Sequence, residues 1–117
     1  MPPEQIFKTL VARGDKRGYL VFCIPVCCEL DLKKAAKAAG DKKVELIHVK
    51  ELLPLTGYIR GGCSPIGMKK HFPTFIDETA ILYDEIGVSG GMRGAQVLLE
   101  PNALCGYVEA EFCDLTV

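Results

Sequence analysis

Short apolar runs separated by polar residues and glycines divide most of the chain into strand-like segments. Residues 7–12 and 18–24 are rich in β-branched and aromatic side chains and flank a polar stretch with a Gly-Asp pair. This arrangement predicts a β-hairpin. The same kind of pattern predicts further strands at residues 44–49, 74–76, 80–83, 85–89, 95–100 and 107–114.

One segment has the periodicity of a helix instead. Leu32, Ala35, Ala36 and Ala39 form a single apolar stripe, and Asp31 and Gly40 stand at its ends as N-terminal and C-terminal caps. Shorter helical segments are expected at residues 50–53, ending near a proline, and at 102–105 after another proline. Many strands with one substantial helix indicate a single α+β domain, residues 1–117, built around a mixed or antiparallel sheet.

The charges are divided unevenly along the sequence. Residues 33–70 contain nine Lys or Arg against three acids, a net charge of +6, whereas residues 71–117 have a net charge of −7. This division permits a basic face that binds a polyanion on a protein with an overall charge of −1. The alternative is that Lys33, Lys34 and Lys37 only keep one face of a helix in water.

The cysteines and the apolar runs narrow the class of protein. Six cysteines without a C-x-x-C motif predict buried, reduced thiols in apolar segments rather than a disulfide scaffold or a zinc site. Among them, Cys63 lies in a glycine-rich segment and is the one candidate for a reactive thiol. No apolar run approaches the ~20 residues that span a bilayer and no signal peptide is evident, so we expect a cytoplasmic protein without membrane contact.

Three polar features interrupt the apolar segments. Lys8 lies inside "FKTL", where it either presents a cation to a pocket or points to solvent from the other face of a strand. The glycines of "GGCSP", residues 61–65, form either a plain turn or a loop whose backbone approaches a ligand. Ser89 begins "SGGMRG", which is otherwise a permissive hairpin turn. None of these is a P-loop, and no histidine is placed to complete a Ser-His-Asp triad.

Together, and in this order, the motifs resemble those of one enzyme family. "FKTL", "TGYIRGGCSPIGMKK", "FPTFIDETA" and "VSGGMRG" are similar to the YbaK family of aminoacyl-tRNA deacylases, which is related to the editing domain of bacterial prolyl-tRNA synthetases. The resemblance extends over residues 4–114. It implies an α+β fold with a strongly curved, barrel-like mixed sheet, surrounded by a few helices, and a pocket at its open side.

The resemblance also implies roles for individual residues. Lys8 matches a pocket lysine that contacts the terminal adenosine region of the tRNA, Gly61 and Gly62 match the loop that holds the aminoacyl ester, and Ser89 matches a pocket serine. Further substrate contacts are implied for Cys63, Ser64, Pro65, Gly90 and Arg93. No metal and no organic cofactor are implied.

The implied reaction is the trans-acting removal of cysteine from mischarged Cys-tRNA(Pro), or from Cys-tRNA(Cys), with attack by the thiol of the substrate on its own ester. Two alternatives stay open: a deacylase for another small amino acid such as alanine, and a non-catalytic module that binds tRNA or a synthetase. A thiol-based redox or metal protein is a third reading, and it predicts either metal in the purified protein or a low-pKa Cys63.

The resemblance implies an aminoacyl-tRNA acceptor end as ligand and prolyl-tRNA synthetase as partner. The family pattern has a longer segment ahead of "FKTL" than the seven residues that precede Lys8 here. From this difference we expect an N-terminally shortened domain in which a second copy covers the exposed wall of the pocket, as a homodimer.

Overall fold

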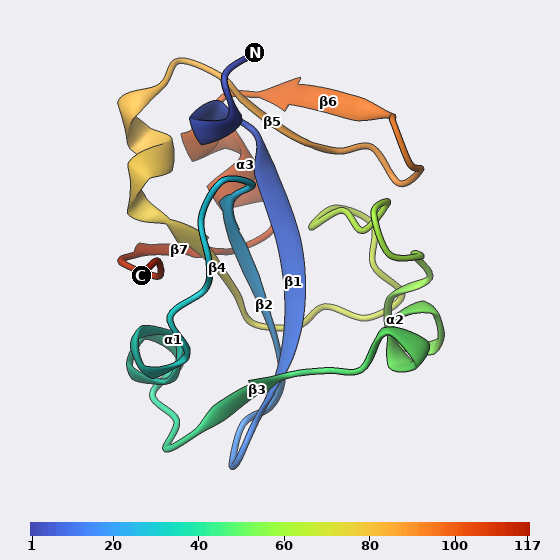
Figure 1. Ribbon diagram of the computed structural model, residues 1–117, viewed down its shortest axis with the longest axis vertical. Helices are drawn as coiled ribbons and strands as arrows, with labels where there is room; N and C mark the ends of the chain where they lie inside the picture. Colours follow the sequence, from blue (N-terminus) through green and yellow to red (C-terminus); the bar gives the residue numbers. More distant parts are fainter.

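A five-stranded mixed sheet forms the centre of the computed structural model, which describes residues 1–117. Its strands follow the order β3-β1-β2-β4-β7 (Figure 1). β1 runs antiparallel to β2 and β3, whereas β4 runs parallel to β2 and to β7. The strands are β1 (Phe7–Gly14), β2 (Gly18–Pro25), β3 (Val44–Leu46), β4 (Thr74–Asp77) and β7 (Glu111–Cys113).

This arrangement confirms a mixed α+β fold and corrects one feature of the expectation. The sheet has two edge strands, β3 and β7, and does not close into a barrel. Two further strands, β5 (Ile86–Ser89) and β6 (Gln96–Leu99), pair with each other as a separate ribbon. This ribbon crosses one end of β1, where a single bridge joins Ile6 to Gly87 (Figure 1).

Two apolar clusters lie on opposite faces of the sheet, because successive residues of a strand point to opposite sides. Phe7, Val11 and Cys23 belong to the cluster that also contains side chains of β5 and of the third helix. Leu20 and Phe22 belong to the other cluster, which contains the alanines of the first helix. The hairpin β1–β2 therefore contributes to both.

The first helix, α1 (Leu32–Ala39), is present as the sequence predicts. The Asp31 carboxylate accepts hydrogen bonds from the N–H groups of Lys33 and Lys34, and Gly40 ends the helix in the left-handed region at φ 68°. A side chain with a Cβ rarely adopts that conformation, so glycine makes a clean stop. The stripe of Ala35, Ala36 and Ala39 is buried.

The other helical segments depart from the expectation at several points. Pro54 lies inside α2 (Val49–Thr56) rather than at its end, at the cost of one backbone hydrogen bond. Of residues 80–83, predicted as a strand, residues 80–82 belong to the 3₁₀ helix η2 (Glu78–Leu82) and Tyr83 is its C-cap, because the Asp77 carboxylate accepts from Thr79 and caps this turn. The remaining helices are η1 (Pro3–Gln5) and α3 (Pro101–Tyr107).

The closing strand is shorter than predicted. Tyr107 ends α3, and Glu109 adopts a positive φ of 55° that turns the chain. Only then does β7 begin, at Glu111. The predicted strand at 44–49 is likewise cut to β3, because Val49 already belongs to α2.

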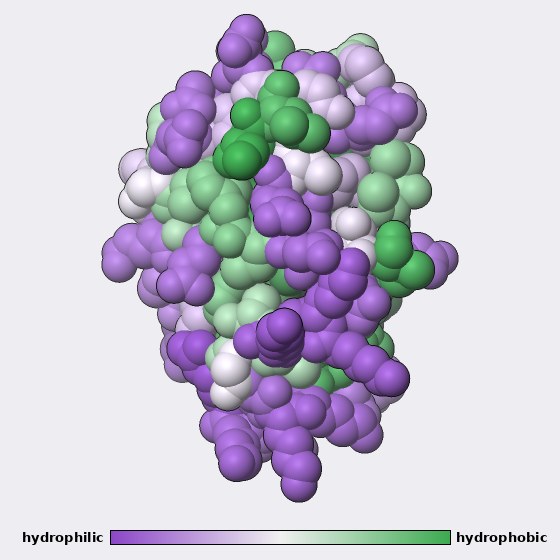
Figure 2. Space-filling model, turned by 90° about the vertical axis from the view of Figure 1, so that its left-hand side faces the viewer, coloured by the Kyte–Doolittle hydropathy of each residue, from purple (hydrophilic) through white to green (hydrophobic).

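The face that carries η2 is shown in Figure 2, where apolar patches alternate with hydrophilic side chains. Ile81 and Leu82 of η2 are exposed. No helix is long and apolar enough to cross a membrane.

Candidate active site in the pocket beside β1

The largest pocket, of about 670 Å³, follows the free edge of β1. β3 pairs only with residues 12–14 of β1, and β5 forms only one bridge on this side, between Gly87 and Ile6, the residue just before β1. The stretch of β1 between these points has no strand beside it. α2 and the loop that follows it lie along this open side (Figure 1).

The backbone of β1 presents polar groups to this pocket. The N–H of Val26 on the β2 side donates to the Ile6 carbonyl at 2.8 Å, whereas the N–H of Ile47 on the β3 side donates to the Val11 carbonyl at 3.1 Å. In an antiparallel ladder successive residues direct their hydrogen-bonding groups to opposite sides. The N–H and C=O of Thr9 therefore face the free edge, where no strand pairs with them.

Lys8 lines the pocket and is half-buried. Its ladder partner is Ile24, so its Cβ lies on the α1 face of the sheet, opposite to that of Phe7 and Val11. The lining of the pocket includes residues from both faces of β1, Lys8 and Leu10 on one and Phe7 and Val11 on the other. None of the three ion pairs in the structure involves Lys8.

A loop after α2 forms the opposite wall and is fixed by Thr56 and Tyr58. Thr56 is buried, and its hydroxyl donates to the Leu52 carbonyl at 2.8 Å and accepts from the N–H of Tyr58 at 3.0 Å. The Tyr58 hydroxyl then donates to the Ile66 carbonyl. These bonds close residues 58–66 into a compact loop and explain why the glycine-rich segment keeps one shape.

Gly61, Gly62 and Cys63 at the tip of this loop differ in whether their N–H groups form hydrogen bonds. Gly62 donates its N–H to the Ile59 carbonyl at 3.0 Å, and it does not line the pocket. Gly61 and Cys63 line the pocket, and their N–H groups have no hydrogen-bond partner within the chain. The backbone donors that remain available at the pocket are therefore those of Gly61 and Cys63.

Ser89 lies at the end of β5 and contributes a hydroxyl without a partner. Its Oγ is the one buried side-chain oxygen or nitrogen that forms no hydrogen bond, although buried polar atoms are nearly always paired. Ser89 lines the pocket together with Gln96, its partner across the β5–β6 ladder. An unpaired buried hydroxyl at a pocket is a ready hydrogen-bonding group for a ligand.

The lining contains three basic side chains, those of Lys8, His48 and Arg60. No aspartate or glutamate lines the pocket. Cys63 is buried, and burial raises the pKa of its thiol to about 11 despite a hydrogen bond with Thr56. The thiol stays protonated near neutral pH, which argues against Cys63 as a reactive thiolate.

The other residues implied as substrate contacts lie outside this lining. Ser64 is buried and accepts from the N–H of Ile66 at 3.2 Å. Gly90 donates to the Ala95 carbonyl in the β5–β6 turn. Arg93 is exposed on the same turn and packs beside Gly61.

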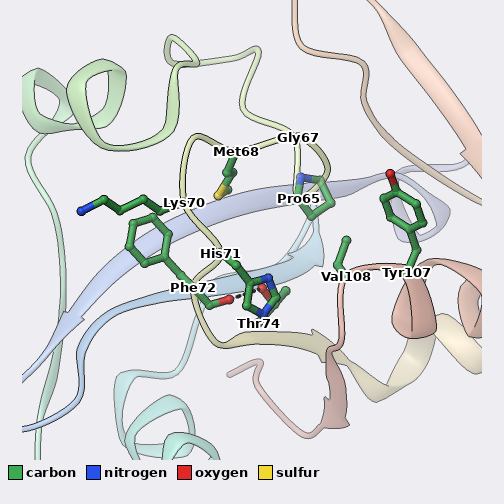
Figure 3. A pocket seen from close by; sticks show the side chains of 9 residues that line it. All are labelled: Pro65, Gly67, Met68, Lys70, His71, Phe72, Thr74, Tyr107 and Val108. Atoms are coloured by element: carbon green, nitrogen blue, oxygen red, sulfur yellow. Dashed lines mark hydrogen bonds between the residues drawn. The ribbon is translucent and has the colours of Figure 1, made fainter.

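Pro65 lines a second, smaller pocket of about 130 Å³. In Figure 3, His71 and Tyr107 border this hollow, while the side chain of Lys70 extends away from it. The Thr74 hydroxyl is used internally, as a donor to the Phe72 carbonyl. No group of three or more His, Cys, Asp or Glu side chains is arranged to hold a metal ion.

Sequence reasoning did not single out four polar contributors to the large pocket: Thr9, His48, Arg60 as a lining residue, and Gln96. Gln96 had a detectable signal, because a hairpin around residues 90–94 places it beside Ser89. No sequence signal pointed to Thr9 or His48, since their location at the pocket depends on where β3 stops pairing with β1.

Comparison with known proteins assigns the chain to a family. The sequence profile described as the aminoacyl-tRNA editing domain matches residues 1–106. The chain belongs to this family. It is 55% identical over 112 residues to a protein of Enterococcus faecalis that carries the provisional name Cys-tRNA(Pro)/Cys-tRNA(Cys) deacylase EbsC, and the match covers 96% of this chain and 68% of the relative.

Two solved structures have the same fold as this chain. One, described as a provisional trans-editing enzyme for prolyl tRNA synthetase, is 30% identical with a TM-score of 0.89, over 99% of this chain and 73% of that one. Another, the hypothetical protein APE2540, has a TM-score of 0.91 at 24% identity, over 100% of this chain and 77% of that one, and shows the fold alone.

Proposed function

We propose that this editing domain is a trans-acting deacylase that removes cysteine from mischarged Cys-tRNA(Pro). The observation that carries the proposal is the unpaired, buried Oγ of Ser89 in a pocket that also holds Lys8 without an ion-pair partner. Both groups lack a partner within the chain, so both are available to a substrate. The name of the Enterococcus relative supports cysteine as the amino acid.

The acceptor end of a tRNA suits the charges of this pocket. It brings phosphates and a terminal adenosine, and phosphate contacts dominate the affinity of proteins for nucleic acids. We assign Lys8 to the terminal nucleotide, with His48 and Arg60 at the exposed rim toward the preceding phosphates. The absence of carboxylates from the lining removes repulsion of this polyanion.

The N–H groups of Gly61 and Cys63 are the donors that we assign to the ester carbonyl. Hydrogen bonds from fixed backbone donors stabilise the negative charge that develops on that oxygen. Gly62 has a different role, because its N–H already bonds Ile59 and a Cβ on it would lie 3.2 Å from the Met92 backbone. Gly62 instead allows the loop to pack on the β5–β6 turn.

Cleavage then needs no nucleophile from the protein. The thiol of the esterified cysteine attacks its own carbonyl, the C–S bond forms, and the C–O bond to the ribose breaks as the ribose oxygen takes up a proton. Water afterwards opens the cyclic thioester to give free cysteine. Holding the thiol against the carbonyl supplies the proximity that such an intramolecular step requires.

The decisive experiment compares deacylation of Cys-tRNA(Pro), Ala-tRNA(Pro) and Pro-tRNA(Pro) by the native chain and by Lys8→Ala. We expect faster loss of the cysteinyl ester than of the other two, and a decrease of about 100-fold in Lys8→Ala, the order expected when a contact that positions the substrate is lost. Lys16→Ala, which removes an exposed lysine from the β1–β2 turn, is the matched control and should keep full activity.

Other outcomes separate the alternatives. Preferential loss of the alanyl ester would make the protein an alanine-editing deacylase. A folded protein that binds tRNA but hydrolyses none of the three esters above the spontaneous rate would be a binding module, and the proposed reaction would be wrong.

We further propose that the protein acts beside prolyl-tRNA synthetase and self-associates. The description of one structural relative supports the first, and the exposed apolar side chains of Leu46, Val49 and Leu53 near the pocket rim support the second. Light scattering across micromolar concentrations, with and without synthetase, tests both. A monomer that leaves the synthetase peak unchanged would contradict both proposals.

A further inference from the structure

Two adjacent cysteines, Cys27 and Cys28, form a close pair of thiols in the turn after β2. Their Sγ atoms lie 3.8 Å apart. The turn is fastened at both sides, because the N–H of Cys28 donates to the Pro25 carbonyl at 3.0 Å and the N–H of Val26 donates to the Ile6 carbonyl at 2.8 Å. The backbone of the turn that carries the two thiols is therefore fixed by hydrogen bonds.

Cys27 differs from the other cysteines in its access to solvent. It is the only exposed one of the six, while Cys23 and Cys63 are buried and the remaining three are half-buried. Burial raises the pKa of the Cys23 thiol to about 12 and that of Cys63 to about 11. A solvent-borne oxidant therefore meets Cys27 first. This finding also corrects the expectation that the thiols are generally buried.

Cys28 is placed to react second. It is half-buried, and burial, the contact with Cys27 and the charge of Asp77 raise the pKa of its thiol, against a smaller opposite effect of Lys8. An accessible cysteine beside a second thiol is the arrangement in which a first oxidation product is resolved as a disulfide.

We propose that Cys27 and Cys28 are an oxidation site for hydroperoxides, which convert the pair into a reversible vicinal disulfide. The Cys27 thiolate attacks the outer oxygen of a hydroperoxide ROOH, the O–O bond breaks, and ROH leaves while Cys27 becomes a sulfenic acid. The Cys28 sulfur then attacks the Cys27 sulfur, the S–O bond breaks, and water leaves. Two thiols and one hydroperoxide thus give one disulfide, one alcohol (water when the oxidant is hydrogen peroxide) and one water.

The geometry makes this disulfide easy to reduce again. Adjacent Cα atoms across a trans peptide are about 3.8 Å apart, shorter than the roughly 4.4–6.8 Å of most disulfides. Closing the ring therefore strains the turn, and strained, exposed disulfides are the ones that thiols reduce readily. Dithiothreitol should restore the dithiol.

The test treats the native full chain with hydrogen peroxide, alkylates the remaining thiols and maps the peptides by mass. We expect the peptide that holds both cysteines to lose two hydrogens and to resist alkylation at both positions, and dithiothreitol to reverse this. In Cys28→Ser, which lacks the second thiol, dimedone should trap a sulfenic acid at Cys27. In Cys27→Ser, Cys28 should remain alkylatable.

Cys105→Ser is the matched control, a half-buried cysteine on α3 whose loss should leave the oxidation of the pair unchanged. Three results would overturn the proposal: both cysteines still alkylatable at a peroxide dose that oxidises glutathione in the same tube, a disulfide that links either cysteine to another chain, or oxidation of Cys28 in Cys27→Ser as fast as in the native protein. None of these readouts depends on deacylation.

Discussion

The Nε of Arg93 donates a hydrogen bond to the carbonyl oxygen of Arg60 at 3.0 Å. This bond joins the β5–β6 turn to the glycine-rich loop, two segments far apart in sequence. Around it, a Cβ on Gly61 would lie 3.3 Å from the Arg93 side chain, and one on Gly62 would lie 3.2 Å from the Met92 backbone. The two segments therefore pack as one wall, which orders the free N–H groups of the pocket.

We expect Arg93→Ala to lower the kcat/KM of deacylation by about tenfold, because losing a bond worth about 1.4 kcal/mol releases the loop. Arg60→Ala is the informative comparison: it also removes one positive charge but keeps the carbonyl that Arg93 bonds. Arg60→Ala should mainly raise KM. It should also reduce the slope of the logarithm of the binding constant against the logarithm of salt concentration by about one. Equal effects of both changes on kcat and salt dependence would mean that charge alone matters.

Loss of the hydroxyl should mainly affect deacylation at Ser89 and mainly affect stability at Ser64. Ser89→Ala should change the free energy of unfolding by less than about 0.5 kcal/mol, because its Oγ has no partner, yet it should lower deacylation. Ser64→Ala should cost about 1 kcal/mol, because its buried Oγ accepts from Ile66. Urea unfolding and deacylation kinetics on both variants check this, and a large loss of stability in Ser89→Ala would contradict a ligand-binding role.

Asp41 should make the stability of the fold depend on acid pH. Partial loss of hydration opposes its ionisation, but backbone N–H groups, among them those of Arg17 and Lys16, donate to its carboxylate and hold the pKa below its ordinary value. A lowered folded-state pKa stabilises the protein above the unfolded value near 3.8, and this contribution is lost as pH falls further.

Asp41→Asn should therefore reduce the free energy of unfolding at neutral pH, and the difference from the native protein should shrink as the pH falls below about 4. Asp15→Asn is the control, because Asp15 lies on the β1–β2 turn whose Lys16 and Arg17 N–H groups donate to Asp41. The measurement is the urea midpoint of each protein from pH 6 to pH 3. If the difference between Asp41→Asn and the native protein stays constant over this range, the Asp41 carboxylate is not the source of the pH dependence.

Local signals made much of the fold predictable. The hairpin β1–β2 and α1 follow from periodicity and from caps within a few residues, at Asp31 and Gly40. The error at residues 80–83 has a non-local component, because the Asp77 carboxylate that caps η2 also accepts from the N–H of Leu115, 38 residues away. An isolated stretch of "AILY" carries no trace of that bond.

The sequence pointed to several residues that the fold brings to one pocket, but not to the geometry of that pocket. The resemblance pointed to Lys8, Gly61 and Ser89, which do line one pocket. It could not show that Gly62 has already used its N–H, because that depends on the closed conformation of the loop. Nor could it show a pocket along the edge of β1, since that edge exists only because β3 pairs with so few residues.

Oxidation of the Cys27–Cys28 pair is expected to lower deacylation several-fold and reversibly. Val26 lines the pocket and bonds the Ile6 carbonyl, two residues before Lys8, and Lys8 is close enough for its charge to act on Cys28. Strain in the turn should therefore shift Lys8 relative to the substrate. The measurement is the deacylation rate before peroxide, after it and after dithiothreitol, with Cys27→Ser alongside. If peroxide inhibits Cys27→Ser as strongly as the native protein, the inhibition does not arise from this pair and the prediction is wrong.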